Sequence, residues 1–281
     1  VVQHWRRAGW RLRIADRFLP AFSAIALMPL LAACAGLVAA LLWSVAGSWF
    51  FPNALPQSLQ LLHWQDVASY GPLIRSSFLI ATTASLAALL LVLAWSYTAP
   101  PEKFDNRWLL GCIFMPFFVP QISFLLGMQI SLSRFGLDGT WLALIWVHMI
   151  FILPYTWLIV IPARQSLDSR LDHVAATLGA SAWQRFRRIH LPVMAYPLGT
   201  ALFIGISVSV ALYLPTVFVG AGRINTITVE AVNLAAGGSR GPAGVTAMLQ
   251  IFIPVLSFIM IHSWLRFRFA GFAGMRSGGL Q

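Results

Sequence analysis

The sequence predicts an all-α membrane protein, a polytopic bundle of six transmembrane helices. Hydrophobic residues make up 59% of the 281 residues, charged residues only 10%, and the mean hydropathy is +0.78. Soluble domains are far more polar. Six apolar stretches are each long enough, at about 20 residues, to cross the ~30 Å hydrocarbon core of a bilayer. Backbone groups in lipid must be satisfied internally and barrel-like alternation is absent, so these stretches are expected to be helices.

No connector between these stretches is long enough to hold a soluble domain, so we expect one membrane domain at residues 21–265. A basic N-terminal segment at 1–20 precedes it and a tail at 266–281 follows it. The predicted spans are Ala21–Val45, Leu73–Trp95, Leu109–Ile130, Thr140–Ile161, Ala195–Val219 and Val245–Leu265.

The first span could instead be a cleaved signal peptide, because it follows a basic segment and ends near Ser44-Val45-Ala46, which resembles a cleavage site. At about 25 residues it is longer than the apolar region of such a peptide, and five more spans follow. We therefore expect a retained helix.

Basic residues lie mainly on one side of the predicted membrane. They occur in the N-terminal segment, the loops after the second and fourth spans, and the tail, whereas Arg75, Arg134, Arg223 and Arg240 lie on or near the other side. Positive residues concentrate in cytoplasmic loops, so both termini are expected in the cytoplasm. The net charge of +11 is therefore mainly a topology signal. Nucleic-acid binding is disfavoured, because the charge is divided among short loops.

The loop after the fourth span, Ser169–Pro192, is polar and amphipathic within an otherwise lipid-like chain. Two capping-box patterns, Ser169 with Asp172 and Ser181 with Gln184, predict two helix starts. Two short helices between membrane spans indicate a docking element for a cytosolic partner.

The first of these short helices is expected to end at Gly179, where a left-handed residue can close a helix. The second contains Trp183 and Phe186 among three arginines and should end near Pro192. One apolar stripe at i, i+3, i+4 and i+7 marks the first helix. The stripe consists of Leu171, Val174, Ala175 and Leu178.

The spacing of this loop resembles a known family signature. The pattern E-A-A-x3-G-x9-I-x-L-P is typical of the membrane permease subunits of binding-protein-dependent ABC importers, and it occurs between the fourth and fifth of six spans. Its second half is present here as Gly179, Ile189, Leu191 and Pro192. The first half departs from the pattern. His173 replaces the acidic residue, with Asp172 one place earlier, and Val174 replaces the first alanine.

The resemblance implies a bacterial inner-membrane subunit with three kinds of protein partner. Two copies of a cytosolic ATPase would rock two permease subunits or halves between inward-open and outward-open states, and a periplasmic or extracellular binding protein would deliver the substrate. The loop would lie in a groove of the ATPase, with its stripe packed into that groove or into the membrane domain. The implied coupling residues are Leu171, Asp172, His173, Val174, Ala175, Leu178, Gly179, Ile189, Leu191 and Pro192.

Two questions stay open at this point. Arg185, Arg187 and Arg188 could meet an acidic ATPase surface or lipid headgroups. The segment Thr228–Gln250 looks like part of the permeases for thiamine, ferric iron and related solutes, several of which fuse two six-helix halves. This chain could therefore correspond to a whole subunit or to the C-terminal half of a longer one.

Enzyme motifs are missing from the sequence. The single lysine, Lys103, does not fit a P-loop, and neither HExxH nor GxSxG occurs. The histidines are scattered, so neither a metal site nor a cofactor is expected. Cys34 and Cys112 fall within spans, where they are expected to be packing residues. A secondary carrier or channel is the alternative function, but it would require mid-membrane charges for ion coupling, and none is found.

Polar residues inside the spans are the candidates for a translocation path. A lone histidine in an apolar run, such as His148, is more often a hydrogen-bonded core residue than a ligand contact. The substrate cannot be read from the sequence. The candidates are Gln121, Ser123, Gln129, His148, Ser207 and Tyr213.

Overall fold

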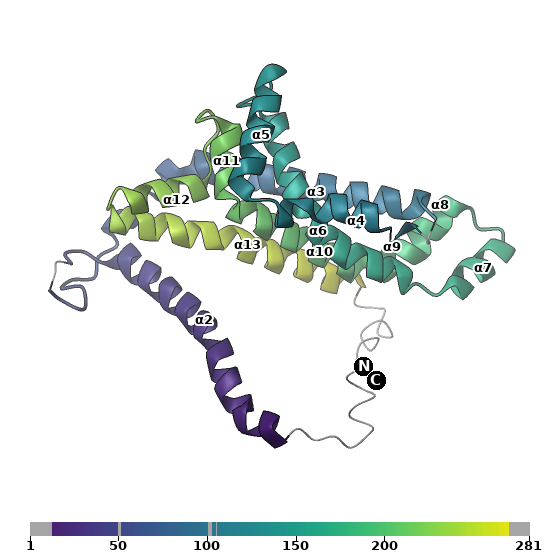
Figure 1. Cartoon of the computed structure of the whole chain (residues 1–281), viewed down its shortest axis with the longest axis horizontal. Helices are drawn as coiled ribbons and strands as arrows, with labels where there is room; N and C mark the ends of the chain where they lie inside the picture. Colours follow the sequence, from purple (N-terminus) through teal and green to yellow (C-terminus); the bar gives the residue numbers. More distant parts are fainter. Residues whose placement is uncertain (1–12, 50–51, 101–102, 105, 270–281) are drawn as a thin grey trace.

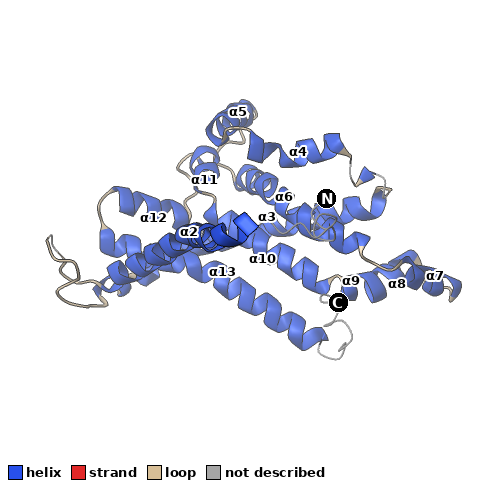
Figure 2. Ribbon diagram, turned by 60° about the horizontal axis from the view of Figure 1, so that its bottom comes forward, coloured by secondary structure: helices blue, strands red, loops and turns tan. Residues whose placement is uncertain are grey.

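The computed structural model describes residues 13–49, 52–100, 103–104 and 106–269, with helices as its regular elements (Figures 1 and 2). Four helices are long and apolar enough to cross a membrane by themselves, and two bent pairs bring the number of spans to as many as six. The protein is therefore an all-α polytopic helix bundle. The four are α2 (Arg13–Val45), α3 (Gly71–Thr98), α6 (Trp141–Gln165) and α13 (Arg240–Phe269).

The predicted domain limits fall inside helices. Residues 13–20 of the expected N-terminal segment belong to α2, and α13 continues into the expected tail as far as Phe269. Residues 1–12 and 270–281 lie outside the described part of the chain.

Helices α3, α6 and α10 (Ala195–Ala211) form the centre of the bundle and pack on one another (Figure 1). Small residues allow this close approach: Ala81, Ala84 and Ala88 of α3 are fully buried. A Cβ atom on Gly205 of α10 would lie 2.8 Å from the Ser85 hydroxyl oxygen. Lipid tails are as apolar as leucine, so helix association in membranes depends on such van der Waals contact.

The expected third span, Leu109–Ile130, is not a single straight helix. It consists of α4 (Arg107–Phe118) and α5 (Gln121–Arg134), bent by 105°. The break lies at Val119 and Pro120: Val119 is extended, as a residue before proline prefers, and Pro120 has no N–H with which to continue the helix. Helix α5 then packs beside α11 (Tyr213–Gly220) through the buried Leu125 and Leu132 (Figure 1).

The expected fifth span, Ala195–Val219, is also divided. Helix α10 ends at Ala211, Leu212 takes ψ 90°, and α11 begins at Tyr213 in a different direction (Figure 1). Pro215 contributes to this break, because it has no N–H to donate to the Ala211 carbonyl and so cannot continue α10; in the first turn of α11 the missing N–H is tolerated.

The glycine-rich region Gly220–Gly244 has regular structure of its own. It contains α12 (Ile227–Ala236), which packs on α13. The Ile227 N–H donates to the Ser77 hydroxyl, and the Thr228 hydroxyl donates to the Val210 carbonyl. These bonds attach α12 to α3 and α10. In the loop between α2 and α3, the described residues include the short helices η1 (Leu62–Trp64) and η2 (Val67–Tyr70).

Helix α2 leaves the bundle and contacts it near one end (Figure 1). The contact is close, because a Cβ atom on Gly244 of α13 would lie 2.5 Å from the Ser44 amide nitrogen. Elsewhere large apolar side chains of α2, such as Leu31 and Val38, are exposed. This apolar surface has no cover from the described residues of the chain itself.

We predict that Gly205→Val lowers the thermal stability of the detergent-solubilised protein, because the larger side chain meets Ser85 and Ile152. Overpacking of this kind costs about 1–3 kcal/mol. The matched control is Gly127→Val on α5, where an added Cβ meets no atom within 4 Å. Heating followed by size-exclusion chromatography measures the effect. Equal melting temperatures for the two variants would contradict the prediction.

Candidate functional site

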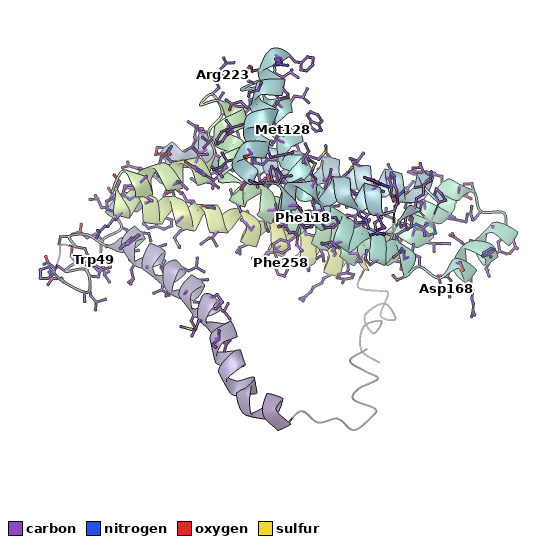
Figure 3. All side chains as sticks on the ribbon, in the orientation of Figure 1. Trp49, Phe118, Met128, Asp168, Arg223 and Phe258 are labelled. Atoms are coloured by element: carbon purple, nitrogen blue, oxygen red, sulfur yellow. The ribbon has the colours of Figure 1, made fainter. Side chains whose placement is uncertain are left out.

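The loop between α6 and α10 folds as a short helical hairpin at one end of the bundle (Figure 2). Its elements are α7 (Ser169–Thr177), α8 (Ala182–Arg185), the π-helical turn η4 (Phe186–His190) and α9 (Leu191–Val193). We call residues 169–193 the hairpin. Figure 3 places Asp168, at its beginning, at the opposite end of the long axis from Trp49.

Gly179 closes α7 as the sequence predicts. Its φ of +80° is left-handed, a conformation that other residues adopt at a cost. The Ala180 N–H donates to the Ala175 carbonyl at 2.9 Å, and the Gly179 N–H donates to the Ala176 carbonyl at 3.0 Å. These two bonds form a Schellman motif, which satisfies carbonyls at the end of the helix.

One of the two predicted capping boxes is confirmed and the other is wrong. Ser181 and Gln184 exchange side-chain and backbone hydrogen bonds at the start of α8. At the start of α7 the cap is Asp168, whose carboxylate accepts from the Arg170 N–H at 2.9 Å. Ser169 is therefore already inside the helix, and the Asp172 carboxylate is directed elsewhere.

The apolar stripe of α7 does not pack into the membrane domain. Leu171 is 50% exposed, Val174 58% and Leu178 81%, while Ala175 is half-buried. Trp183 of α8 is also exposed. Of the two expected locations for the stripe, the structure excludes the membrane domain. A cluster of large exposed apolar side chains on a short amphipathic helix is a surface suited to a protein partner.

The second half of the motif leads from the hairpin into α10. Pro192 is in the first turn of α9, where a missing N–H is tolerated, and α9 ends at Val193, close to the predicted end. At Met194 the chain bends by 69° into α10. Ile189 is half-buried, and Leu191 is partly exposed beside it.

Tyr97, near the end of α3, packs against two aromatic rings of the hairpin. The His190 ring stacks on it with centroids 5.5 Å apart, and the Phe186 ring meets it edge-on at 5.1 Å. The Arg164 guanidinium of α6 lies 4.5 Å from the centre of the Tyr97 ring. Aromatic contacts thus join the hairpin to α3, and the cation–π contact joins that end of α3 to α6.

Sequence reasoning missed Tyr97 and Arg164. An aromatic residue and a basic residue at the ends of two spans are expected anyway as interfacial anchors, so no local pattern distinguishes them. Their pairing is a long-range contact that the periodicity of one segment cannot show.

A second polar cluster lies in the membrane interior, around the fully buried His148 of α6. Its Nδ1 lies 2.8 Å from the Ser209 hydroxyl, and its Nε2 lies 3.1 Å from the Thr216 hydroxyl. Because the Thr216 hydroxyl donates its proton to the Leu212 carbonyl, it must accept from Nε2–H. Ser209 then donates to Nδ1. His148 is a hydrogen-bonded core residue, neutral and satisfied at both nitrogens.

The interior beside His148 is closed. The gap between His148, Ser77, Ser209 and Thr226 has no room for a water molecule. The sequence missed Thr216, which reaches His148 because the break at Leu212 redirects α11.

The other candidates for a translocation path do not gather around His148. On α5, Gln121 and Gln129 are half-buried and Ser123 is exposed. The Ser207 hydroxyl donates to the Phe203 carbonyl of its own helix, and Tyr213 is half-buried at the start of α11. The path they were expected to line stays a prediction. Among the described residues there is also no group of three side chains that could hold a metal.

A polytopic helix bundle with a helical hairpin exposed at one end of its spans is typical of the membrane domain of a transport system. The chain belongs to the family described as binding-protein-dependent transport system inner membrane component, which it matches over residues 95–270. This family comprises multi-pass inner-membrane permeases of ABC importers, so the resemblance carried by the loop is confirmed.

The chain resembles several bacterial permeases. It is 35% identical over 185 residues to the inner membrane ABC transporter permease protein YnjC of Escherichia coli, covering 66% of this chain and 35% of YnjC. It is 26% identical over 251 residues to the putative 2-aminoethylphosphonate transport system permease protein PhnV of Salmonella paratyphi A, covering 82% and 93% of the two chains. The chain thus spans about a third of YnjC and most of PhnV.

The fold also resembles that of a solved transporter. A crystal structure of a bacterial ABC transporter involved in the import of the acidic polysaccharide alginate matches 90% of this chain and 97% of its own, with a TM-score of 0.56 and 16% identity. This likeness shows the fold of the chain.

We predict that Ser209→Ala lowers thermal stability, because it leaves the buried Nδ1 of His148 without a partner. An unsatisfied buried polar group costs about 1–3 kcal/mol. Ser207→Ala on the same helix is the control, since its hydroxyl bonds only its own backbone. If both variants melt at the same temperature in detergent, the His148 bond does not contribute as we expect.

Proposed function

We propose that this chain is the membrane-spanning subunit of an ABC importer that forms the translocation path for a small solute. Hydrolysis of ATP by a separate ATPase would drive it, and a binding protein would deliver the solute. The observation that carries the proposal is the exposed apolar stripe of α7, because large apolar side chains outside the bilayer require a partner.

The geometry around the hairpin supports transmission of force rather than simple attachment. The stripe lies on α7, and the other end of the hairpin continues through Met194 into the central helix α10. Tyr97 joins the same hairpin to α3, and Arg164 of α6 packs on the Tyr97 ring. A partner that displaces α7 would therefore act on the three helices at the centre of the bundle.

We further propose that both termini and the hairpin face the cytoplasm. The hairpin elements α7, α8 and α9 lie at the same end of the bundle as the C-terminal end of α13 (Figure 2), and the last turn of α13 carries Arg266 and Arg268. Positive residues favour the cytoplasmic side.

A second permease half or copy and lipid are the partners we propose for α2, whose large apolar side chains between Ile25 and Leu41 are mostly exposed where their burial is described. The thiamine- or iron-type solute suggested by the region Thr228–Gln250 has no support from the relatives. Their names specify 2-aminoethylphosphonate, sulfate, and molybdate or tungstate. We propose a small solute without narrowing its class.

A secondary carrier or channel is a weaker proposal. Such a carrier couples transport to ions through charged groups within the membrane. In the described spans, charged residues lie near helix ends, as Arg75 of α3, Arg164 of α6 and Arg266 of α13 illustrate.

We predict that Leu178→Glu abolishes co-purification of the ATPase while the protein still inserts and folds. Leu178 is 81% exposed, so the change removes apolar docking surface without disturbing the bundle. Leu61→Glu is the matched control, since Leu61 is 64% exposed in the loop before α3. Pull-down from membranes through a tag on this chain measures the ATPase. Normal ATPase recovery with Leu178→Glu would remove the proposed docking surface.

We predict that a fluorescent protein fused after residue 281 becomes fluorescent, whereas alkaline phosphatase fused there stays inactive. Green fluorescent protein exported through the general secretion pathway does not fold, and alkaline phosphatase needs the oxidising periplasm. The same reporters placed in the loop near Gly238, on the proposed outer side, should give the opposite pattern. Active phosphatase at the C-terminus would reverse the proposed topology.

A further inference from the structure

The two halves of the family signature are joined to each other in this chain by one polar pair. The Asp172 carboxylate of α7 lies 2.8 Å from Nε2 of His190, the last residue of the π-helical turn. His190 is the variable residue of the I-x-L-P element, between Ile189 and Leu191. The pair spans the hairpin from its docking helix to the segment that enters the membrane.

His190 is held from two sides. Its side chain is 9% exposed and stacks on Tyr97, while the Asp172 side chain is 28% exposed. The second ring nitrogen, Nδ1, is buried and has no hydrogen-bond partner among the described residues. Among the described residues, Asp172 is thus the hydrogen-bond partner of the His190 imidazole. The contacts run in series from Asp172 through His190 and Tyr97 to Arg164.

His173, which occupies the acidic position of the family signature, plays no part in this series. Its side chain is exposed, and its Nδ1 donates to the Ser169 carbonyl of the same helix at 2.7 Å. Asp172, one position earlier, is on the part of α7 that faces the second half of the hairpin. The Asp172 carboxylate is therefore hydrogen-bonded within the hairpin, while the exposed side chain of His173 can face a partner.

The π-helical turn explains how His190 can face inward. A π turn carries one more residue than an α turn, so it changes the angular position of every residue that follows. The Leu191 N–H bonds the Phe186 carbonyl across this turn. Phe186 and His190, its first and last residues, both contact Tyr97.

We propose that Asp172 and His190 are positioning residues for energy coupling: their pairing holds the docking helix α7 rigidly on the end of α3, where Tyr97 in turn contacts Arg164 of α6. This inference rests on the proposed function. When the ATPase moves α7, the paired hairpin moves as one body and displaces the central helices. Without the pair, α7 still docks through its exposed stripe, but its motion is no longer transmitted.

The first test measures the pairing without any partner. Inside-out membrane vesicles carrying this chain are treated with trypsin, and cleavage at the hairpin arginines is followed through a C-terminal tag. Asp172→Ala and His190→Phe should each be cleaved about tenfold faster, because each removes a hydrogen bond to a charged group. His190→Phe retains an aromatic ring against Tyr97, so it separates the hydrogen bond from the stacking.

Two further variants control this test. His173→Ala, at the exposed neighbouring imidazole, should be cleaved at the wild-type rate. Asp172→Glu keeps the carboxylate and should restore most of the protection. Wild-type cleavage rates for both Asp172→Ala and His190→Phe would overturn the proposal.

The second test uses the complex that a tag on the wild-type chain isolates with its ATPase. Asp172→Ala and His190→Phe should retain the ATPase, but MgATP hydrolysis per bound ATPase should change by about tenfold, and Asp172→Glu should restore it. Faster trypsin cleavage with unchanged hydrolysis would show that the pair is only a structural brace, which overturns the coupling role. Failure of the wild-type chain to retain any ATPase would instead contradict the proposed function, and the trypsin result would stand apart from it.

Discussion

The absence of water from the hydrocarbon core is the constraint on which this structure depends. Polar groups in the spans are stabilised by partners inside the protein, because an unpaired group in lipid costs several kcal/mol, and among the described residues the buried Ser85 hydroxyl is an exception. Hydroxyls such as those of Thr82 and Ser257 therefore donate to carbonyls one turn earlier in their own helices. His148 of α6 cannot be satisfied in this way. It forms hydrogen bonds with Ser209 of α10 and Thr216 of α11, which link the three helices.

The same constraint explains why the polar segments lie at the ends of the bundle. The hairpin exposes its helix termini and arginines, and it compensates with caps and a Schellman motif built from local residues such as Asp168, Gly179 and Ser181. Its attachment to the bundle is different in character. It depends on ring contacts at Tyr97, with the His190 ring hydrogen-bonded to Asp172 inside the hairpin.

Sequence reasoning was most successful where the signal is local. The left-handed Gly179 and the Ser181 capping box follow from a few neighbouring residues. The direction of a helix after a break does not, so the bends at Val119 and Leu212 could be suspected from nearby prolines but not oriented. Contacts across many residues, such as Arg164 with Tyr97, depend on packing that no single window of sequence contains.

Helix α10 lies between two interruptions, at Met194 on the hairpin side and at Leu212 on the other. Its 17 residues form one uninterrupted rod of about 25 Å, most of the thickness of the lipid core. Near its far end is Ser209, bonded to His148. A tilt imposed at Met194 would therefore move Ser209 through the backbone of α10 alone, and with it the hydrogen bond to His148.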